Sequence, residues 1–278
     1  MTGIERAGGW SGESTPPEPL ALRYGELDDQ VGDLHLPAAG HPPQVPVVAL
    51  LHGGFWRMPY GRDPLDALAR DLARRGFAAW NLEYRRLGAP GAGWPGTFAD
   101  VAAGLDRLAQ RVASAPDLDL ERVAVVGHSA GGQLALWAAA RGRLPGDAPG
   151  ADPRLRPAAV AALAPLADLE RVHRERLGGS AVAELLGGTP EQVPERYRAA
   201  SPHARLPLGL PQLLLHGTSD AEVPIDHARD YARAARAAGD PIDFRELPGG
   251  GHMDFLDPAG AAHSILCEWL ALTLRLFP

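Results

Sequence analysis

The sequence of 278 residues contains no lysine, and all 27 of its basic residues are arginines. Without lysine the chain cannot form a Schiff base with a substrate or with pyridoxal phosphate, and it cannot complete a Walker A loop. The sequence also lacks HExxH and comparable spacings of metal ligands. These absences exclude several classes of enzyme, and we expect neither a metal ion nor a cofactor.

Cysteine is almost absent as well, since Cys267 is the only one. A single cysteine cannot form an intramolecular disulfide, and its apolar neighbours in a terminal helical pattern predict a buried packing residue. A net charge of −7 argues against a surface for nucleic acid. The longest apolar stretch surrounds Ser129 and is interrupted by glycines, so we expect no membrane span. Because no signal-peptide pattern precedes residue 20, we expect a cytoplasmic protein, either a monomer or a homodimer.

Apolar runs and amphipathic segments alternate along the chain, which predicts an α/β fold with a mostly parallel sheet and helices on both faces. An early strand at 30–36 is expected to be antiparallel and near an edge. Residues 1–19 are expected to be a flexible leader before a single domain at 20–278. Residues 168–207 break the alternation, and we expect them to form a short helical cap over the carboxyl edge of the sheet.

The segment Gly127–Gly131, with the sequence GHSAG, lies between the strand-like run 123–126 and the helix-like run 133–140. A serine in such a strand-turn-helix context is typical of a nucleophile elbow. The glycines allow the strand and the helix to pass close to Ser129, and the helix N-terminus favours developing negative charge. Other α/β proteins also have glycine-rich turns with a serine, so this hypothesis needs partner residues elsewhere.

Serine becomes a strong nucleophile only when an oriented base takes its proton. In folds with a nucleophile elbow the acid and then the histidine follow the serine. Asp220 comes just after the apolar run 211–215, and we interpret it as the acid, with Glu222 as the nearby alternative. The base is expected after the next strand, where three glycines precede His252.

The segment His52–Trp56, with the sequence HGGFW, directly follows the apolar run 45–51. Its unshielded backbone N–H groups could stabilise an oxyanion, which acyl transfer requires. We assign this role to Gly54, together with Gly53 or Phe55, and to the N–H of Ala130. Phe55 and Trp56 are expected to wall the substrate pocket. His128 is also placed beside the substrate, as a packing or hydrogen-bonding residue.

With these elements assembled, the chain resembles the α/β-hydrolase superfamily, and within it the small HGG-type esterases and kynurenine-formamidase-like hydrolases, which are related to the catalytic domain of prolyl oligopeptidases. The resemblance implies Ser129 as the nucleophile, His252 as the base and Asp220 as the orienting acid. It also implies an oxyanion hole from Gly53, Gly54 and Ala130. The matching stretches are 52–56, 81–86, 93–97, 127–132, 185–190, 216–224 and 251–252.

The leading hypothesis is therefore a serine hydrolase that cleaves a small carboxylic ester through an acyl-enzyme. The alternatives are an arylformamidase acting on N-formylkynurenine, a small peptidase or amidase, and a catalytically silent hydrolase fold that binds a ligand. Arg85 and Arg86 follow a core strand together with Glu83. They could bind a substrate carboxylate, although a structural ion pair with Glu83 is the favoured interpretation.

Overall fold

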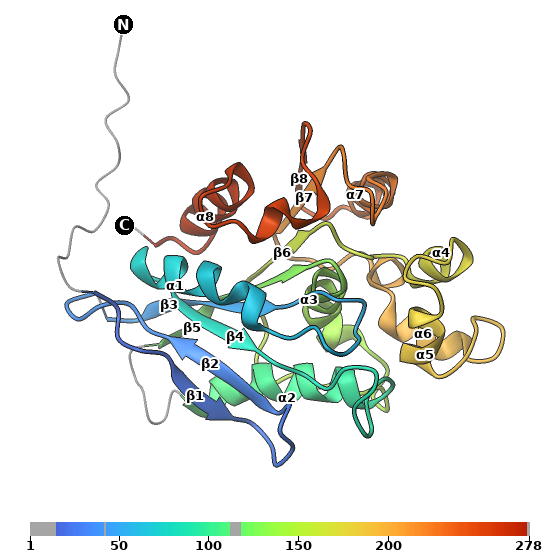
Figure 1. Ribbon diagram of the computed structural model, residues 1–278, viewed down its shortest axis with the longest axis horizontal. Coiled ribbons are helices and arrows are strands. Elements are labelled where there is room, and N and C mark those ends of the chain that lie inside the picture. Colours follow the sequence, from blue (N-terminus) through green and yellow to red (C-terminus); the bar gives the residue numbers. More distant parts are fainter. Residues whose placement is uncertain (1–14, 42, 112–117, 277–278) are drawn as a thin grey trace, which may run out of the picture.

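Figure 1 presents the computed structural model, which describes residues 15–41, 43–111 and 118–276. Most of the expected leader, residues 1–14, lies outside the described residues. So do residues 112–113, at the end of a helix that the spacing of apolar residues predicts over 97–113. The first strand of the described chain begins at Leu20.

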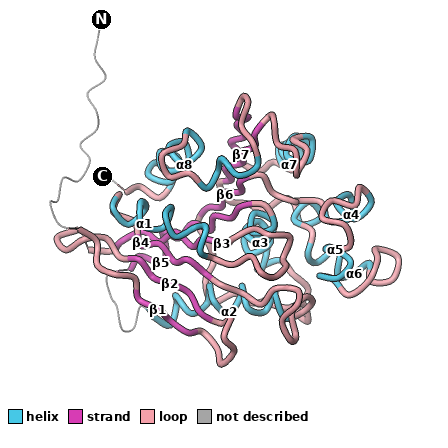
Figure 2. The backbone as a smooth tube through the Cα atoms, in the orientation of Figure 1, coloured by secondary structure: helices cyan, strands magenta, loops and turns pink. Residues whose placement is uncertain are grey.

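A single eight-stranded sheet runs through the middle of the molecule, with helices around it (Figure 2). The strand order is β1-β2-β4-β3-β5-β6-β7-β8. The strands are β1 (Leu20–Arg23), β2 (Val31–His35), β3 (Val45–Leu51), β4 (Ala78–Leu82), β5 (Leu118–His128), β6 (Ala159–Leu163), β7 (Gln212–Gly217) and β8 (Ile242–Leu247).

The sheet is parallel except at one edge, where β2 pairs antiparallel with both β1 and β4. The predicted antiparallel strand is therefore correct, whereas β1 was not predicted. All seven residues of β3 are buried, as expected for a central parallel strand covered on both faces.

The helices cover the sheet in two layers, and each layer closes its own apolar core (Figure 1). One core contains side chains of α1 and α8, and the other contains those of α2, α3 and α7. The longer helices are α1 (Asp66–Arg74), α2 (Gly96–Arg111), α3 (Ala130–Ala140), α7 (Asp226–Ala237) and α8 (Ala261–Thr273). Short 3-10 helices span 63–65, 141–143, 202–205 and 252–256. Across the described residues, every helix is too short or too polar to cross a membrane.

The segment 168–207, expected to be a short helical cap, lies between β6 and β7 and contains three short α-helices. They are α4 (Leu169–Arg174), α5 (Ala181–Leu186) and α6 (Pro194–Ala200), and they gather at the right of Figure 1. The side chain of Asp168 caps α4 by accepting from the Arg171 N–H. These short helices contact the loop after β3, since Arg57 in that loop forms an ion pair with Glu184 of α5 at 2.8 Å.

Candidate active site

Ser129 occupies a sharp turn between β5 and α3, with φ 56° and ψ −120°. A non-glycine residue with positive φ is strained and persists only where its surroundings fix it. The Ser129 N–H is held by the Leu163 carbonyl at 2.8 Å. A Cβ on Gly131 would lie 2.1 Å from the carbonyl oxygen of Leu51, so this position requires glycine. The predicted elbow is therefore present, and it brings Ser129 to the end of β5.

His252 meets Asp220 across the ends of β7 and β8. Its Nδ1–H donates to Oδ2 of Asp220 at 2.7 Å, and the aspartate side chain is fully buried. Glu222 lies on the opposite side of the ring, with Oε2 3.8 Å from Nε2 of His252. Of the two carboxylates that the sequence left open, Asp220 is the one that binds Nδ1 of His252 in the structure.

A second histidine, which the sequence analysis did not single out, also contacts this carboxylate. His216 is fully buried at the end of β7, and its Nε2 lies 3.2 Å from Oδ2 of Asp220. The same nitrogen lies 2.9 Å from the carbonyl oxygen of Val223. Both neighbours accept, so Nε2 carries the proton. The available signal was its position, directly after the predicted strand 211–215 and four residues before Asp220.

The pKa of Asp220 reflects two opposing effects. Burial alone would raise it, but hydrogen bonds from His216, His252 and the Val223 N–H hold the pKa well below its usual range. The carboxylate is therefore ionised throughout the neutral range, and it can fix the orientation of His252.

The HGG loop lies directly against the elbow. A Cβ on Gly53 would be 3.1 Å from the Cβ of Ser129. Within the described part of the chain, the backbone N–H groups of Gly53 and Gly54 have no hydrogen-bond partner. Ala130 is the first residue of α3, where a backbone N–H has no acceptor in its own helix. The three predicted donors therefore come from two loops that converge next to Ser129.

A buried network fixes the HGG loop from behind. Nε2 of His52 lies 2.8 Å from Oε1 of Glu83, and Nδ1 lies 2.8 Å from the carbonyl oxygen of Gly53. The Tyr84 ring stacks on the His52 ring at 4.2 Å between centroids, and its hydroxyl donates to the His52 carbonyl. Burial would raise the pKa of Glu83, but the hydrogen bond and charge of His52, with help from Arg86, lower it.

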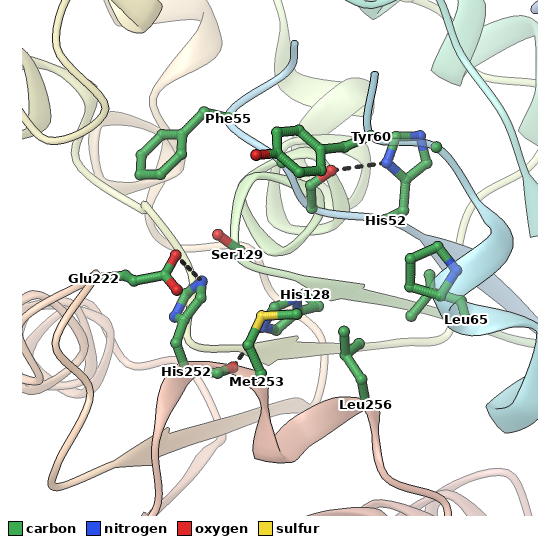
Figure 3. Close-up of a pocket in the computed structure, with 14 residues that line it drawn as sticks. His52, Phe55, Tyr60, Leu65, His128, Ser129, Glu222, His252, Met253 and Leu256 are labelled. Atoms are coloured by element: carbon green, nitrogen blue, oxygen red, sulfur yellow. Dashed lines mark hydrogen bonds and ion pairs between the residues drawn. The ribbon is translucent and has the colours of Figure 1, made fainter. Parts of the chain in front are cut away.

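Ser129 opens onto a cavity of about 420 Å³ (Figure 3). The cavity wall contains Ser129 and His252 and no residue from the segment 168–207. The expected cap thus supports the site from beside it, since Gly178 packs against the Phe55 ring. The residues lining the cavity are His52, Gly53, Gly54, Phe55, Tyr60, Gly61, Pro64, Leu65, His128, Ser129, Glu222, His252, Met253 and Leu256.

The three residues expected beside the substrate have different positions. Phe55 and His128 line the cavity, but Trp56 does not. Trp56 is fully buried, and its indole N–H donates to Oε1 of Gln133 at 3.0 Å. Phe55 and Trp56 both have positive φ, so the chain turns the two adjacent side chains apart. The placement of Trp56 on the pocket wall is therefore corrected: it joins the core under α3.

His128 is a buried neutral histidine at the base of the cavity. Burial and the neighbouring His252 ring lower the pKa of His128 to about 4. Its Nε2–H donates to the carbonyl oxygen of His252 at 2.8 Å. This bond ties the elbow to the segment that carries His252, so His128 helps to set the distance between the two.

The two arginines after β4 form structural ion pairs, which is the interpretation that the sequence favoured. Arg85 pairs with Asp100 at 2.7 Å, and Arg86 pairs with Asp29 at 2.5 Å and with Glu83 at 3.4 Å. Neither arginine lines the cavity.

One group of possible metal ligands occurs among the described residues, away from the cavity wall. Ligand atoms of Asp71, His263 and Cys267 lie within 4.8 Å of one another between α1 and α8. The Asp71 carboxylate already accepts hydrogen bonds from His263 and Arg75. Burial raises the pKa of the Cys267 thiol to about 12 and keeps it protonated. We interpret this cluster as a hydrogen-bonded contact between helices, and the expectation of no metal or cofactor stays a prediction.

Comparison with known proteins identifies the family. The profile of the BD-FAE family matches residues 32–234, which is more than half of the chain and includes Ser129 and Asp220. The chain belongs to the BD-FAE family. This is an α/β-hydrolase esterase family, so the predicted fold and the predicted serine hydrolysis of carboxylic esters are confirmed. The finer resemblance to kynurenine formamidases is not confirmed.

Related sequences include other esterases. This BD-FAE chain is 29% identical over 279 residues to esterase LipC of Mycobacterium tuberculosis, which covers 91% of the chain and 68% of LipC. It is 28% identical over 232 residues to LipM, a probable carboxylic ester hydrolase of the same organism, which covers 80% of the chain and 52% of LipM. The chain thus spans about two thirds of the length of LipC and about half of the length of LipM.

Solved structures agree on the fold. A truncated carbohydrate esterase from gut microbiota superposes with a TM-score of 0.79 at 19% identity, over 95% of this chain and 99% of that one. The thermophilic esterase Est2 of Thermogutta terrifontis, with bound propionate, gives 0.74 at 23% identity, over 93% and 94% of the two chains. At this identity the likeness establishes the architecture alone.

Proposed function

We propose that this chain hydrolyses a small carboxylic ester, with Ser129 as the nucleophile, His252 as the general base and Asp220 as the orienting acid. The observation that carries the proposal is the 2.7 Å bond from Nδ1 of His252 to Asp220, beside a strained serine that opens onto the same cavity. An anionic carboxylate at Nδ1 leaves Nε2 to exchange protons with the substrate side.

In the first step Ser129 Oγ forms a bond to the ester carbonyl carbon while Nε2 of His252 takes its proton. The carbonyl oxygen becomes an oxyanion and accepts hydrogen bonds from backbone N–H groups of Gly53, Gly54 and Ala130. The bond to the alcohol oxygen then breaks, and His252 returns the proton to the leaving alcohol. Preorganised N–H donors stabilise the charge that develops, which is commonly the largest contribution to such catalysis.

In the second step a water molecule attacks the acyl-enzyme and gives its proton to His252. The carboxylic acid leaves, and Ser129 regains its proton. The backbone N–H groups of Gly53 and Gly54 support both steps, because they have no partner among the described residues and are free to bind the oxyanion.

Two alternatives use the same machinery on different carbonyls, an aryl formamide or a small peptide. An ester is favoured because, in the part of the chain that the structure describes, no arginine lines the cavity to pair with the carboxylate of an amino acid or peptide. Arg85 and Arg86, the residues considered for that role, are committed to buried or half-buried acids. A cytoplasmic location remains a prediction.

The test is turnover of p-nitrophenyl acetate and longer acyl esters, run beside N-formylkynurenine and aminoacyl amides. Ser129→Ala is expected to lose at least a thousandfold in kcat. Ser264→Ala, an exposed serine on α8, is the matched control and should keep the wild-type rate. A fluorophosphonate should label the wild type at Ser129 and leave Ser129→Ala unlabelled.

Full activity in Ser129→Ala would refute the mechanism. A kcat/KM for N-formylkynurenine well above that for every ester would replace the ester with the formamide.

A further inference from the structure

Charge is distributed unevenly around Ser129. In Figure 3, Glu222 and Phe55 lie on one side of the serine, and Leu65 and Leu256 lie on the other. Glu222 is the only carboxylate among the described residues that line the cavity, and no arginine lines it. The two sides of the cavity therefore present different chemistry to the two parts of an ester.

The position of Glu222 is fixed by Asp220. The backbone N–H of Glu222 donates to Oδ1 of Asp220 at 2.9 Å, while Oδ2 of the same carboxylate binds His252. The Glu222 side chain is 52% exposed, with Oε2 3.8 Å from Nε2 of His252. Among the described residues, no arginine forms an ion pair with Glu222. Its negative charge thus reaches the cavity without a guanidinium to neutralise it.

The proposed reaction tells which part of the ester meets this charge. This inference rests on the proposed ester hydrolysis. In that reaction the alcohol oxygen of the ester receives a proton from Nε2 of His252. The alcohol part must then lie next to Nε2, and so next to Glu222. The acyl part is left with the apolar wall on the other side, where Leu65 and Leu256 line the cavity.

We propose that Glu222 determines specificity for the alcohol part of the ester: alcohols carrying a positive charge are favoured, and alcohols carrying a carboxylate or sulfonate are disfavoured. A carboxylate repels a like charge and attracts an ammonium group across a few ångströms, moderately where water reaches it. The Phe55 ring on the same side adds an aromatic face, which also favours a cation.

The experiment uses three acetates of similar size that differ in the charge of the alcohol part. They are acetylcholine, its neutral carbon analogue 3,3-dimethylbutyl acetate, and 2-sulfoethyl acetate. For each protein the kcat/KM of the two charged esters is divided by that of the neutral one, so that any effect on the shared chemistry cancels. The wild type should prefer the cationic ester over the anionic one by about tenfold at low salt, and less at high salt.

Glu222→Gln should bring the ratio of cationic to anionic ester close to one, and Glu222→Lys should reverse the preference. Glu268→Gln, an exposed glutamate on α8, is the control and should keep the wild-type ratio. If the ratio is the same in the wild type and in Glu222→Gln, the assignment of Glu222 is wrong while ester hydrolysis stands. If the wild type turns over none of the three acetates, or if Ser129→Ala turns them over equally well, ester hydrolysis at Ser129 fails and this assignment fails with it.

Discussion

Nδ1 of His52 lies 2.8 Å from the carbonyl oxygen of Gly53, the residue that follows it. The Gly53 carbonyl and the Gly54 N–H belong to one planar trans peptide, so they point in opposite directions. A hydrogen bond that holds the carbonyl therefore also aims the Gly54 N–H. Because the other ring nitrogen is bound to Glu83, this buried pair sets the direction of a proposed oxyanion donor.

Glu83→Gln is expected to lower kcat for a neutral ester about tenfold while KM changes little. The loss is smaller than that for deletion of an oxyanion donor, because the Gly54 N–H remains present but is less firmly oriented. The measurement is kcat and KM for p-nitrophenyl acetate, with Glu195→Gln on the exposed face of α6 as control. A change confined to KM would show that Glu83 does not act through the oxyanion loop.

His216 is expected to position Asp220. Replacing it with leucine removes one hydrogen bond to a buried carboxylate, which should lower kcat about tenfold with a small change in KM. His216→Gln can still donate near the Nε2 position and should recover part of the rate. The rates are compared at equal folded fraction, measured by circular dichroism. A wild-type kcat in His216→Leu would contradict this role.

Stability should fall as the pH drops from about 6.5 to about 4. The pKa of His128 is about 4 in the folded chain, whereas a histidine in the unfolded chain has a pKa near 6.5. Between these pH values the unfolded state binds a proton at His128 that the folded state does not bind. The free energy of unfolding therefore falls by roughly 3 kcal/mol by about pH 4. Burial also lowers the pKa of His35 and His227, which adds loss in the same direction.

Urea unfolding at pH 7 and pH 5 measures this loss. His128→Gln should reduce the difference in unfolding free energy between the two pH values by about 2 kcal/mol. Ser264→Ala, an exposed serine on α8, is the control and should leave the difference unchanged. An unchanged difference in His128→Gln would mean that His128 is not the group that resists protonation.

Alanine substitutions at two neighbouring glycines can distinguish an effect of backbone strain on stability from an effect of pocket shape on KM. Gly178 and Gly179 have φ values of 69° and 70°, so alanine at either position should cost roughly 1–2 kcal/mol of stability. A Cβ at 178 would lie 2.4 Å from Cδ1 of Phe55, whereas nothing lies within 4 Å of a Cβ at 179. Gly178→Ala should therefore displace the Phe55 ring and raise KM, while Gly179→Ala should only lower the melting temperature. Equal KM values in the two variants would exclude support of the pocket by the segment 168–207.

The order of elements could be predicted from the sequence because Ser129, Asp220 and His252 each come in the turn or loop after a predicted strand. Parallel strands end at the same edge, so Ser129, Asp220 and His252 were expected together, and the structure brings them together. The distinction between Asp220 and Glu222 was not readable. It depends on which carboxylate meets Nδ1, and that is set by a turn in which Asp220 accepts from the Val223 N–H.

The prediction that Trp56 lines the substrate pocket was wrong for a different reason. An aromatic pair after an HGG loop gives no indication of which ring faces the cavity. Here two successive residues with positive φ turn Trp56 toward Gln133 and leave Phe55 in the pocket. Similarly, β1 could not be recognised, because a four-residue edge strand owes its existence to pairing with β2 rather than to its own pattern.

The apolar wall and Glu222 come from different segments of the chain. The wall is built by residues after β3 and by the 3-10 helix at 252–256, whereas the charge comes from one half-exposed side chain in the turn before α7. A single codon change at position 222 can thus redirect the choice of alcohol without repacking the interior. Preference for the acid and preference for the alcohol can drift separately in related genes, and a designer can vary one while holding the other constant.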